Sequence, residues 1–433
     1  MNGTDQSAEA ACPRLAARDS LYTPVTVVEL DLAHPDELHS PGGRGHTHPD
    51  GRVLALVRLH GHPLGLVTAS GAPGDRAGLH RALVEAAHRH LPVTETTATP
   101  PAHPSRAGCA AAPAGPPLIS VVVATHDRVD QLRLCLDSLL RNGYPRYEVI
   151  VVDNAPSGDE AMTLVRDRYA GRVRYLREPV AGLARAHNRA LRAVRGSICA
   201  FTDDDTLADP GWLAALAAAF GQDRRIGCVT GLILPAELRT ATQATLERLS
   251  GFGKGFEPLR WSLADPPGDP LFPFTAGQFG TGANMAFRTS TLNWVGGFDP
   301  AMGTGTPARG GDDLLAFFRT LAAGYTVAYQ PDAVIWHRHR STPQAVPAQV
   351  FGYGAGFGAF LAAALAAEPG MLPALLRRLP GGVRHAARQA AQSGRAGDPD
   401  GNAPGLGLLH LRGLAYGPVG YWRSRLQARR MGG

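Results

Sequence analysis

The stretch LISVVVATHDRVDQLRLCLDSLL, residues 118–140, decides the fold of this chain. Its first part, residues 118–124, is a continuous apolar run rich in valine, which is typical of a parallel strand buried on both faces. Between residues 129 and 140, apolar side chains recur at three- and four-residue spacing, which predicts a helix with one buried face. A buried strand followed directly by such a helix predicts an α/β domain.

The alternation of strand and helix continues towards the C-terminus. It predicts strands at residues 147–152, 173–176 and 197–201 and helices at residues 159–168 and 183–194. This order favours an open, doubly wound sheet with right-handed crossovers. Because ligands of such sheets bind at the carboxyl ends of the strands, the residues at those ends carry the functional information.

A smaller unit precedes this domain. Residues 25–32 and 53–59 have the pattern of strands and residues 77–90 that of a helix, so we expect an accessory α+β domain within residues 1–105. The proline-rich sequence that follows predicts a linker at residues 106–117. We expect this linker to separate two independent cores.

After the linker we expect a catalytic domain at residues 118–345 and a helical, basic region at residues 346–433. Within that region, residues 350–367 are uncharged and rich in glycine and alanine. Two interpretations stay open for them, a buried or interfacial helix, which the composition favours, and a membrane span. The arginines that follow fit either anionic lipid headgroups or a solvated basic tail.

Composition narrows the classes of function. The net charge of +6 and the sequence pI of about 9.3 suit a phosphate-bearing ligand or an anionic membrane and do not demand nucleic acid. The 5 cysteines are scattered without a Cys-x-x-Cys pair, which argues against a disulfide framework or a structural zinc site. The first residues lack the apolar core of a signal peptide, so the expected compartment is the cytoplasm.

Carboxylates follow three of the predicted strands. The segments are THDR at 125–128, DN at 153–154 and TDDDT at 202–206. In extended backbone, Asp203 and Asp205 would point to one side and Asp204 away from it. Two carboxylates in this place repel unless a cation lies between them, which indicates Mg²⁺ or Mn²⁺ bridging to substrate phosphates. A solvated acidic turn that caps the next helix is the alternative.

Further motifs follow the opening strand and helix in a fixed order. They are YPRYEVIVVDNAPSGD, GLARAHNRAL, FTDDDT, GTGANMAFRTSTLNWVGGFDPAMGTG, ARGGDDLLAFFRTLAAGY and VIWHRHR. From about residue 117 to residue 340, this ordered set resembles glycosyltransferase family 2. The resemblance implies a GT-A fold, an α/β doubly wound mixed sheet, here preceded by the small α+β domain and followed by the helical region. It also implies an inverting transfer of a sugar from a nucleotide-diphosphate sugar to an acceptor hydroxyl.

The resemblance assigns roles to individual residues. Those implied to bind the nucleotide sugar are Thr125, Asp127, Arg128, Asp153, Arg185, Asn188, Asp204 and Asn284. A divalent cation, Mn²⁺ or Mg²⁺, is implied at Asp203, Asp205 and His337. The acidic pair Asp312 and Asp313 opens a predicted helix, and by register with the family Asp313 is the catalytic base and Asp312 its helper.

The implied partners are a nucleotide-diphosphate sugar and a hydroxyl acceptor, lipid-linked or polysaccharide, in the synthesis of cell-surface glycans. Peripheral contact with the cytoplasmic face of a membrane belongs to the same expectation, and nucleic acid does not. A non-catalytic GT-A-like nucleotide-binding or scaffold protein is the alternative function, and the intact set of acids argues against it. A nucleotidyltransferase would carry a glycine-rich, basic loop after the first strand, which this sequence lacks.

Overall fold

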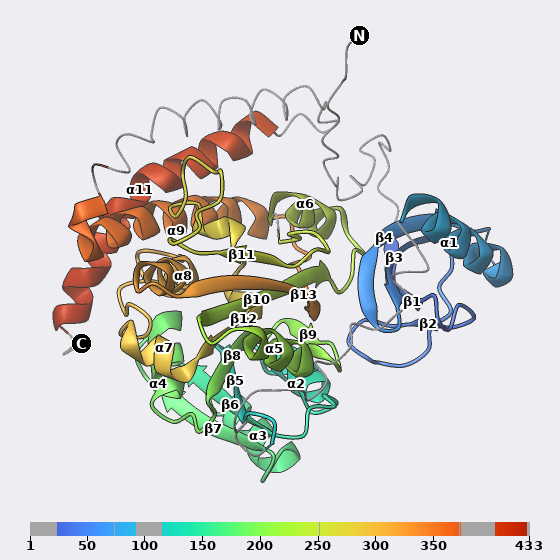
Figure 1. Ribbon diagram of the computed structural model, residues 1–433, viewed down its shortest axis with the longest axis horizontal. Coiled ribbons are helices and arrows are strands. Elements are labelled where there is room, and N and C mark those ends of the chain that lie inside the picture. Colours follow the sequence, from blue (N-terminus) through green and yellow to red (C-terminus); the bar gives the residue numbers. More distant parts are fainter. Residues whose placement is uncertain are drawn as a thin grey trace.

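The computed structural model describes residues 24–72, 74–91, 115–250, 252–371, 373 and 403–430. Most of the predicted linker at 106–117 and the arginines between residues 377 and 388 lie outside these ranges. The described residues form a small N-terminal unit, a larger α/β domain and two long C-terminal helices (Figure 1).

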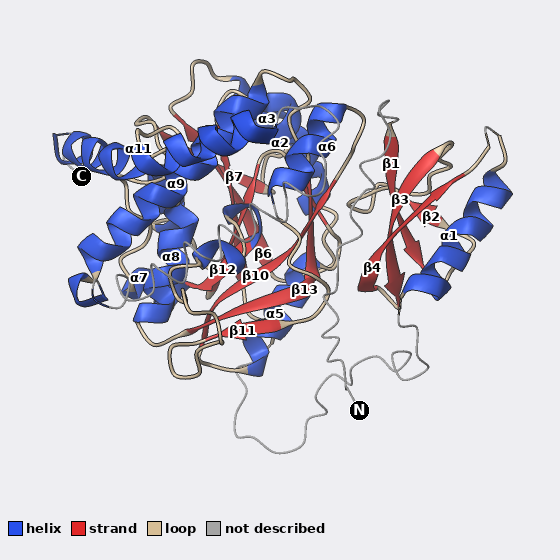
Figure 2. Cartoon of the chain, turned by 90° about the horizontal axis from the view of Figure 1, so that it is seen from above, coloured by secondary structure: helices blue, strands red, loops and turns tan. Residues whose placement is uncertain are grey.

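The N-terminal unit is a four-stranded sheet with one helix. Its elements are β1 (Val25–Asp31), β2 (Leu38–His39), β3 (Arg52–Leu59), β4 (His62–Ser70) and α1 (Arg76–His90). The strand order is β2-β1-β3-β4, with β1 and β3 parallel and the other neighbours antiparallel. α1 covers the outer face of the sheet (Figure 2), where Leu79 and Leu83 share a core with Leu30 and Val57. This is the α+β arrangement expected from the sequence.

The other face of this sheet packs against the larger domain. Val25, Val27, Leu54 and Leu56 belong to the same hydrophobic core as side chains of the second sheet. The backbone N–H of Val25 also donates to the carbonyl of Leu238 at 2.9 Å. The expectation of two independent cores is therefore wrong for this face, because every second side chain of β1 and β3 points into the larger domain.

The larger domain is built on a nine-stranded mixed sheet. Its strands are β5 (Ile119–Thr125), β6 (Tyr147–Asn154), β7 (Val173–Glu178), β8 (Ile198–Asp203), β9 (Thr206–Ala208), β10 (Ile226–Pro235), β11 (Leu259–Trp261), β12 (Met285–Arg288) and β13 (Thr326–His337). The order is β11-β13-β10-β12-β8-β5-β6-β7, and β9 pairs with β13. β5 to β8 pair in parallel, whereas β12 runs antiparallel to both β8 and β10.

Helices cover both faces of this sheet. α2 (Val129–Leu139), α3 (Glu160–Arg168) and α5 (Trp212–Gln222) share a core with one face, and α4 (Leu183–Leu191) and α8 (Asp312–Ala322) with the other. The shorter elements are α6 (Ala241–Ser250), α7 (Thr289–Trp294) and the 3-10 turns η2 (Ala276–Gln278), η3 (Gly282–Asn284) and η4 (Pro369–Met371). Each of the four strands predicted between residues 118 and 201 begins and ends within two residues of the observed strand, β5, β6, β7 or β8.

Two long helices, α9 (Ala345–Ala367) and α11 (Ala403–Arg430), lie against each other beyond α8 (Figure 1). Glycines line their contact. A Cβ atom at Gly354 or Gly358 would clash with the backbone of α11, and one at Gly413 or Gly417 would clash with the backbone of α9. The two helices therefore touch backbone to backbone, which only glycine permits.

In the part of the chain that the structure describes, α9 is the one helix long and apolar enough to cross a membrane. Half of its most apolar window is buried inside the protein. Near its middle, Gly356 packs against the backbone of Gly310 and Gly311, which immediately precede α8. These contacts fit the buried-helix interpretation that the sequence favoured.

Candidate active site

The turn after β8 brings three consecutive carboxylates to the edge of the sheet. β8 ends at Asp203, and Asp204 and Asp205 form the turn that leads into β9. Nη1 of Arg128 lies 3.1 Å from Asp204 Oδ1 and 3.2 Å from Asp205 Oδ2. The Thr125 hydroxyl donates to the other oxygen of Asp204 at 2.7 Å. The backbone turns here instead of staying extended, so Asp204 and Asp205 face one guanidinium, contrary to the prediction that Asp204 points away.

Asp205 also faces His337, the last residue of β13. Asp205 Oδ1 lies 3.3 Å from His337 Nε2, and both side chains are largely buried. Burial alone would raise the pKa of Asp205, but the neighbouring imidazole outweighs it and lowers that pKa. Burial alone would lower the pKa of His337, but Asp205 outweighs it and raises that pKa. The two groups therefore hold each other in their charged forms.

Asp203 differs from Asp205 in its surroundings. Burial raises the pKa of Asp203 to about 7, and the charge of Asp205 adds to this effect. The ligand atoms of Asp203, Asp205 and His337 do not all lie within 4.8 Å of one another. Among the described residues, the group of three that meets this spacing lies in the N-terminal unit. The residues nevertheless fit a divalent cation, because Asp203 and Asp205 both present buried carboxylates at this turn and oxygen ligands suit Mg²⁺ and Mn²⁺.

The end of β6 contributes Asp153. This side chain is 1% exposed, and its Oδ2 accepts a hydrogen bond of 2.8 Å from the hydroxyl of Tyr175 in β7. Its Oδ1 is buried and has no hydrogen-bond partner. Burial raises the pKa of Asp153. A buried acceptor left unpaired at a strand end is costly unless a ligand completes it, which suits a nucleoside-binding carboxylate.

Asp127 joins the loops that follow β5 and β6. Its φ of 52° lies in the left-handed region, and its carboxylate accepts from the backbone N–H of Ser157 at 3.1 Å and from the Ser157 hydroxyl at 2.6 Å. These hydrogen bonds lower the pKa of Asp127. Asp127 thereby fixes the two loops that border the predicted nucleotide pocket.

A second pair of acids opens α8. Asp313 Oδ2 accepts a 2.8 Å hydrogen bond from the backbone N–H of Gly282, and burial, reinforced by Asp312, raises the pKa of Asp313 to about 7. Asp312 is 5% exposed, and its Oδ2 lies 3.5 Å from Nδ1 of the buried His187. Asp312 thus faces the protein interior and Asp313 faces η3, because successive residues of a helix point about 100° apart.

Both acidic clusters meet across η3. Asp313 is hydrogen-bonded to the first residue of this turn, while the carbonyl of Ala283 accepts a 2.8 Å hydrogen bond from Thr202, the residue before Asp203. The charge of Asp312 also contributes to the raised pKa of Asp203. A carboxylate with a pKa of about 7 and a cluster suited to a cation and phosphates therefore border the same site.

Residues 120–292 match the family model of glycosyl transferase family 2. The chain carries a family 2 glycosyltransferase domain. The matched range contains the strand ends of β5, β6 and β8 and the turn η3. The GT-A fold expected from the sequence, with its added N-terminal unit and C-terminal helices, is confirmed.

Several curated proteins are similar to this chain. O-antigen biosynthesis protein RfbC of Myxococcus xanthus is 28% identical over 193 residues, which are 43% of this chain and 15% of that protein. Pre-mycofactocin glycosyltransferase of Mycobacterium tuberculosis is 27% identical over 228 residues, 52% of this chain and 43% of that protein. The chain thus spans less than half the length of these relatives.

Among solved structures, a mannosyltransferase of Pyrobaculum calidifontis in complex with GDP-Man and Mn²⁺ is similar, with 20% identity and a TM-score of 0.46. The match covers 72% of this chain and 90% of that one.

Two predicted ligands of the donor have structural roles in the glycosyltransferase domain. Asn284 is fully buried, where its Oδ1 accepts from the indole of Trp212 at 2.9 Å and its Nδ2 donates to two backbone carbonyls. Asn188 exchanges two hydrogen bonds with the backbone of Phe298. Every polar atom of Asn284 and both amide ends of Asn188 thus bond to the protein, which argues against a role of these amides in binding the donor.

The other predicted ligands differ in how free they are. The sequence predicted that Asp204 binds the donor. Both of its oxygens accept hydrogen bonds from Arg128 and Thr125, so in this structure Asp204 orients the guanidinium. Nη2 of Arg185, in the first turn of α4, is buried without a hydrogen-bond partner. An unpaired guanidinium nitrogen of this kind suits a phosphate.

Two residues that touch the predicted site, Tyr175 and His187, were not predicted from the sequence. Tyr175 orients Asp153, and its position in an ordinary alternating strand gave no signal. His187 faces Asp312 from α4 and packs between Phe201 and Phe298. It stands inside the GLARAHNRAL motif, on the apolar face of the helix, where a buried histidine was a detectable signal.

Proposed function

We propose that this protein is an inverting, metal-dependent glycosyltransferase that moves a sugar from a nucleotide-diphosphate sugar to an acceptor hydroxyl. The observation that carries the proposal is the position of Asp313. Its carboxylate is hydrogen-bonded to Gly282 of the turn that borders Thr202 and Asp203, and its pKa is raised by burial to about 7. A carboxylate with that pKa is suited to accept a proton near neutral pH.

The reaction is a single displacement at the anomeric carbon. The acceptor oxygen bonds to that carbon as the bond to the diphosphate oxygen breaks, and the electron pair leaves with the diphosphate. The proton of the acceptor hydroxyl passes to Asp313 while the new bond forms. The hydrogen bond from Gly282 holds one carboxylate oxygen in place, and the backbone N–H of Leu314 holds the other at 2.8 Å.

The donor binds along the ends of β5, β6 and β8. The unpaired Oδ1 of Asp153 accepts from the base or ribose, and the unpaired Nη2 of Arg185 donates to the diphosphate. Asp205, with Asp203 beside it and with His337 once its imidazole is neutral, would hold Mn²⁺ or Mg²⁺, and Arg128 positions Asp205. A cation held there would supply positive charge to stabilise the leaving diphosphate. The names of the relatives support a glycan or glycoconjugate acceptor.

The test is release of free nucleoside diphosphate from a panel of nucleotide sugars, with Mn²⁺ and with hydroxyl acceptors. Asp313→Asn should lower release by about a hundredfold or more and leave binding of the nucleotide sugar nearly unchanged. Asp167→Asn, which changes an exposed carboxylate on α3, should keep full activity. If the wild-type protein binds a nucleotide sugar and never turns it over with any acceptor, the non-catalytic alternative replaces the proposal.

The same proposal extends to the acceptor side and to the location of the protein. α11 exposes an apolar stripe formed by Leu408, Leu411, Val419, Trp422 and Leu426, each at least 50% exposed. Their spacing of three, four and eight residues keeps them on one side of the helix. Arginines flank the stripe on both sides, at positions 412, 423, 425, 429 and 430. An apolar stripe between cations suits the surface of an anionic membrane, at its cytoplasmic face.

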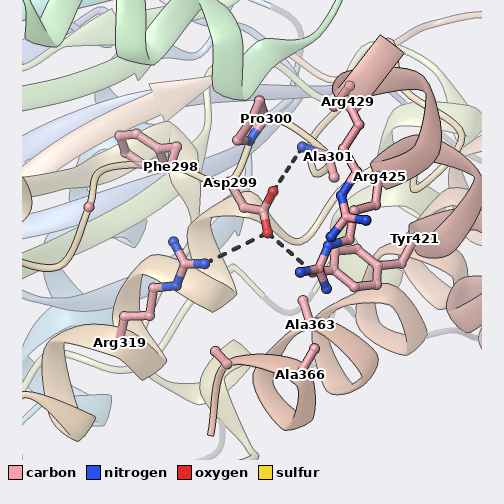
Figure 3. Close-up of a pocket in the computed structure, with 13 residues that line it drawn as sticks. Phe298, Asp299, Pro300, Ala301, Arg319, Ala363, Ala366, Tyr421, Arg425 and Arg429 are labelled. Carbon is pink, nitrogen blue, oxygen red and sulfur yellow. Dashed lines mark hydrogen bonds and ion pairs between the residues drawn. The ribbon is translucent and has the colours of Figure 1, made fainter. Parts of the chain in front are cut away.

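A cavity beside this stripe supports the membrane contact. It measures about 510 Å³ and lies between α8, α9, α11 and the loop that holds Asp299 (Figure 3). Arg319, Arg425 and Arg429 line it, against the single carboxylate of Asp299, which accepts from Tyr421 at 3.3 Å and pairs with Arg319 at 3.7 Å. The excess of guanidinium groups suits the phosphate of a lipid headgroup.

Vesicle co-sedimentation tests this part. The full chain should bind vesicles that contain phosphatidylglycerol, less so at high salt, and should not bind neutral phosphatidylcholine vesicles. Trp422→Asp with Leu426→Asp should reduce binding by about tenfold or more, because both apolar contacts are lost. Leu249→Asp, an exposed leucine on α6, is the control. Equal binding to neutral and anionic vesicles, or none at all, contradicts the contact.

A further inference from the structure

The N-terminal unit contains a short hairpin that brings a carboxylate and two imidazoles together. His39 at the end of β2 is the antiparallel bridge partner of His46. Backbone hydrogen bonds close the hairpin on both sides of this bridge, from Ser40 N–H to the Gly45 carbonyl at 2.9 Å and from Thr47 N–H to the Leu38 carbonyl at 2.8 Å. Directly opposed residues of an antiparallel bridge project to the same side, so the backbone itself places the two rings together.

Glu37 completes the cluster from two residues before His39. Its Oε2 lies 3.7 Å from Nε2 of His39 and 3.9 Å from Nδ1 of His46. One ligand atom from each of the three residues lies within 4.8 Å of the other two, and the two rings are 4.6 Å apart between centroids. Among the described residues, Glu37, His39 and His46 are the group of three or more histidine, cysteine or carboxylate side chains whose ligand atoms come this close together.

We propose that Glu37, His39 and His46 bind a zinc ion. Two imidazoles and one carboxylate are ligands that Zn²⁺ takes readily, and they suit Mg²⁺ poorly because it prefers an all-oxygen shell. Ligands about 2.1 Å from a tetrahedral ion lie about 3.4 Å from one another. The observed separations of 3.7 and 3.9 Å from Glu37, and a third of at most 4.8 Å between the imidazoles, would reach that value by side-chain rotation. The fourth position faces solvent, because the three side chains are 37%, 51% and 61% exposed.

The hairpin links this site to the glycosyltransferase domain. Its tip holds Gly42 and Gly43, where a Cβ atom would press on Leu207 of β9 and on Pro210. Nη2 of Arg141 in turn donates to the carbonyl of Gly42 at 3.3 Å. Leu207 lies two residues after Asp205, so the zinc ion would stiffen the hairpin that backs the acidic turn. The zinc site itself does not depend on the proposed function.

Zinc titration of the metal-free full chain tests the proposal, with zinc chloride as the probe. Asp205→Ala is used as the background, so that zinc does not occupy the acidic turn. This variant should retain one zinc ion per chain after gel filtration, measured by elemental analysis. Adding His39→Ala and His46→Ala should weaken zinc binding by at least about a hundredfold, because ligands are lost outright. Adding His88→Ala and His90→Ala, two exposed histidines of α1, should change nothing.

A second measurement is independent of stoichiometry. Zinc should raise the melting temperature of the Asp205→Ala protein by mass action, and Mg²⁺ in excess should not. The rise should disappear with Glu37→Gln, His39→Gln and His46→Gln, side chains of similar size that preserve the hairpin. The proposal is wrong if the variants of His39 and His46 bind zinc as tightly as their parent protein. It is also wrong if loss of His88 and His90 on α1 weakens zinc binding as much as loss of His39 and His46 does.

Discussion

The guanidinium of Arg58 in the N-terminal sheet donates a 2.6 Å hydrogen bond to the carboxylate of Asp209, which follows β9 in the glycosyltransferase domain. Arg58 also donates to Glu29 at 2.9 Å, and all three side chains are buried. Asp209 additionally accepts from the backbone N–H of Gly211 at 2.8 Å, so it fixes the start of α5. A buried cluster of one guanidinium and two carboxyl groups therefore joins the N-terminal unit to the chain four residues after Asp205.

Arg58→Ala should destabilise the whole protein. The substitution leaves Glu29 and Asp209 buried without their cation, which costs about 3–5 kcal/mol. Denaturant unfolding measures this loss, and Arg89→Ala, an exposed arginine on α1, should change stability by no more than about 0.5 kcal/mol. Equal stabilities of the two variants would mean that the cluster does not hold the units together.

Activity should depend on pH through Asp313. Burial raises the pKa of this carboxyl to about 7, and the base must be deprotonated. The sign follows directly: turnover should rise with pH, by about tenfold per unit at low pH, and level off above about pH 7. The pH profile of kcat measures this. A profile that is flat between pH 5 and 8, or that falls as pH rises, contradicts the role of Asp313.

Asp313→Asn keeps the shape of the side chain and removes its basicity. Turnover should fall by about a hundredfold or more, while the affinity for the nucleotide sugar stays nearly unchanged. Asp312→Asn should have a smaller effect on turnover, because Asp312 faces His187 inside the protein. If Asp312→Asn abolishes turnover and Asp313→Asn does not, the two roles are reversed.

Asp205→Ala should abolish the response of the acidic turn to Mn²⁺. In the wild-type protein with a nucleoside diphosphate, Mn²⁺ should raise the melting temperature, since it binds the folded state. The variant should lose this rise and its transferase activity, while Asp265→Ala in an exposed loop retains both. Normal turnover by Asp205→Ala in chelator-treated buffer would rule out a cation at this turn.

Two glycines of α9, Gly356 and Gly352, offer a matched pair of substitutions. Gly356→Ala should cost about 1–3 kcal/mol, because its Cβ would press on Gly310 and Gly311, which directly precede Asp312 and Asp313. It should also lower kcat more than it changes KM, since those glycines position Asp312 and Asp313. Gly352→Ala has open space around its Cβ and should stabilise α9 by up to about 1 kcal/mol. Equal effects of the two would exclude the contact.

The strands β5 to β8 could be predicted well from the sequence, because local patterns of apolar residues reveal them. The valine-rich runs at β5 and β6 are buried on both faces, and a short, continuous apolar run of β-branched residues is typical of such a strand. The acids Asp153, Asp203 and Asp205 stand at strand ends, where topology alone gathers them.

What the sequence could not predict depends on contacts between distant segments. Asn284 is occupied by Trp212 and by the carbonyls of Leu232 and Ala333, and no local pattern reveals those partners. The packing of β1 and β3 against the larger domain could not be predicted for the same reason. A strand apolar on both faces indicates burial on two sides but not what covers the second.

β12 enters the sheet in the direction opposite to both of its neighbours. Met285, at its start, therefore pairs with Phe201 near the end of β8, and the chain reaches this edge from the loop that precedes β12. Insertions or deletions in that loop would reshape the space in front of Asp313 without shifting the strands that end in Asp153 and Asp203. Under the proposed function, the length of this loop would alter the acceptor side and leave the strands of the nucleotide side in place.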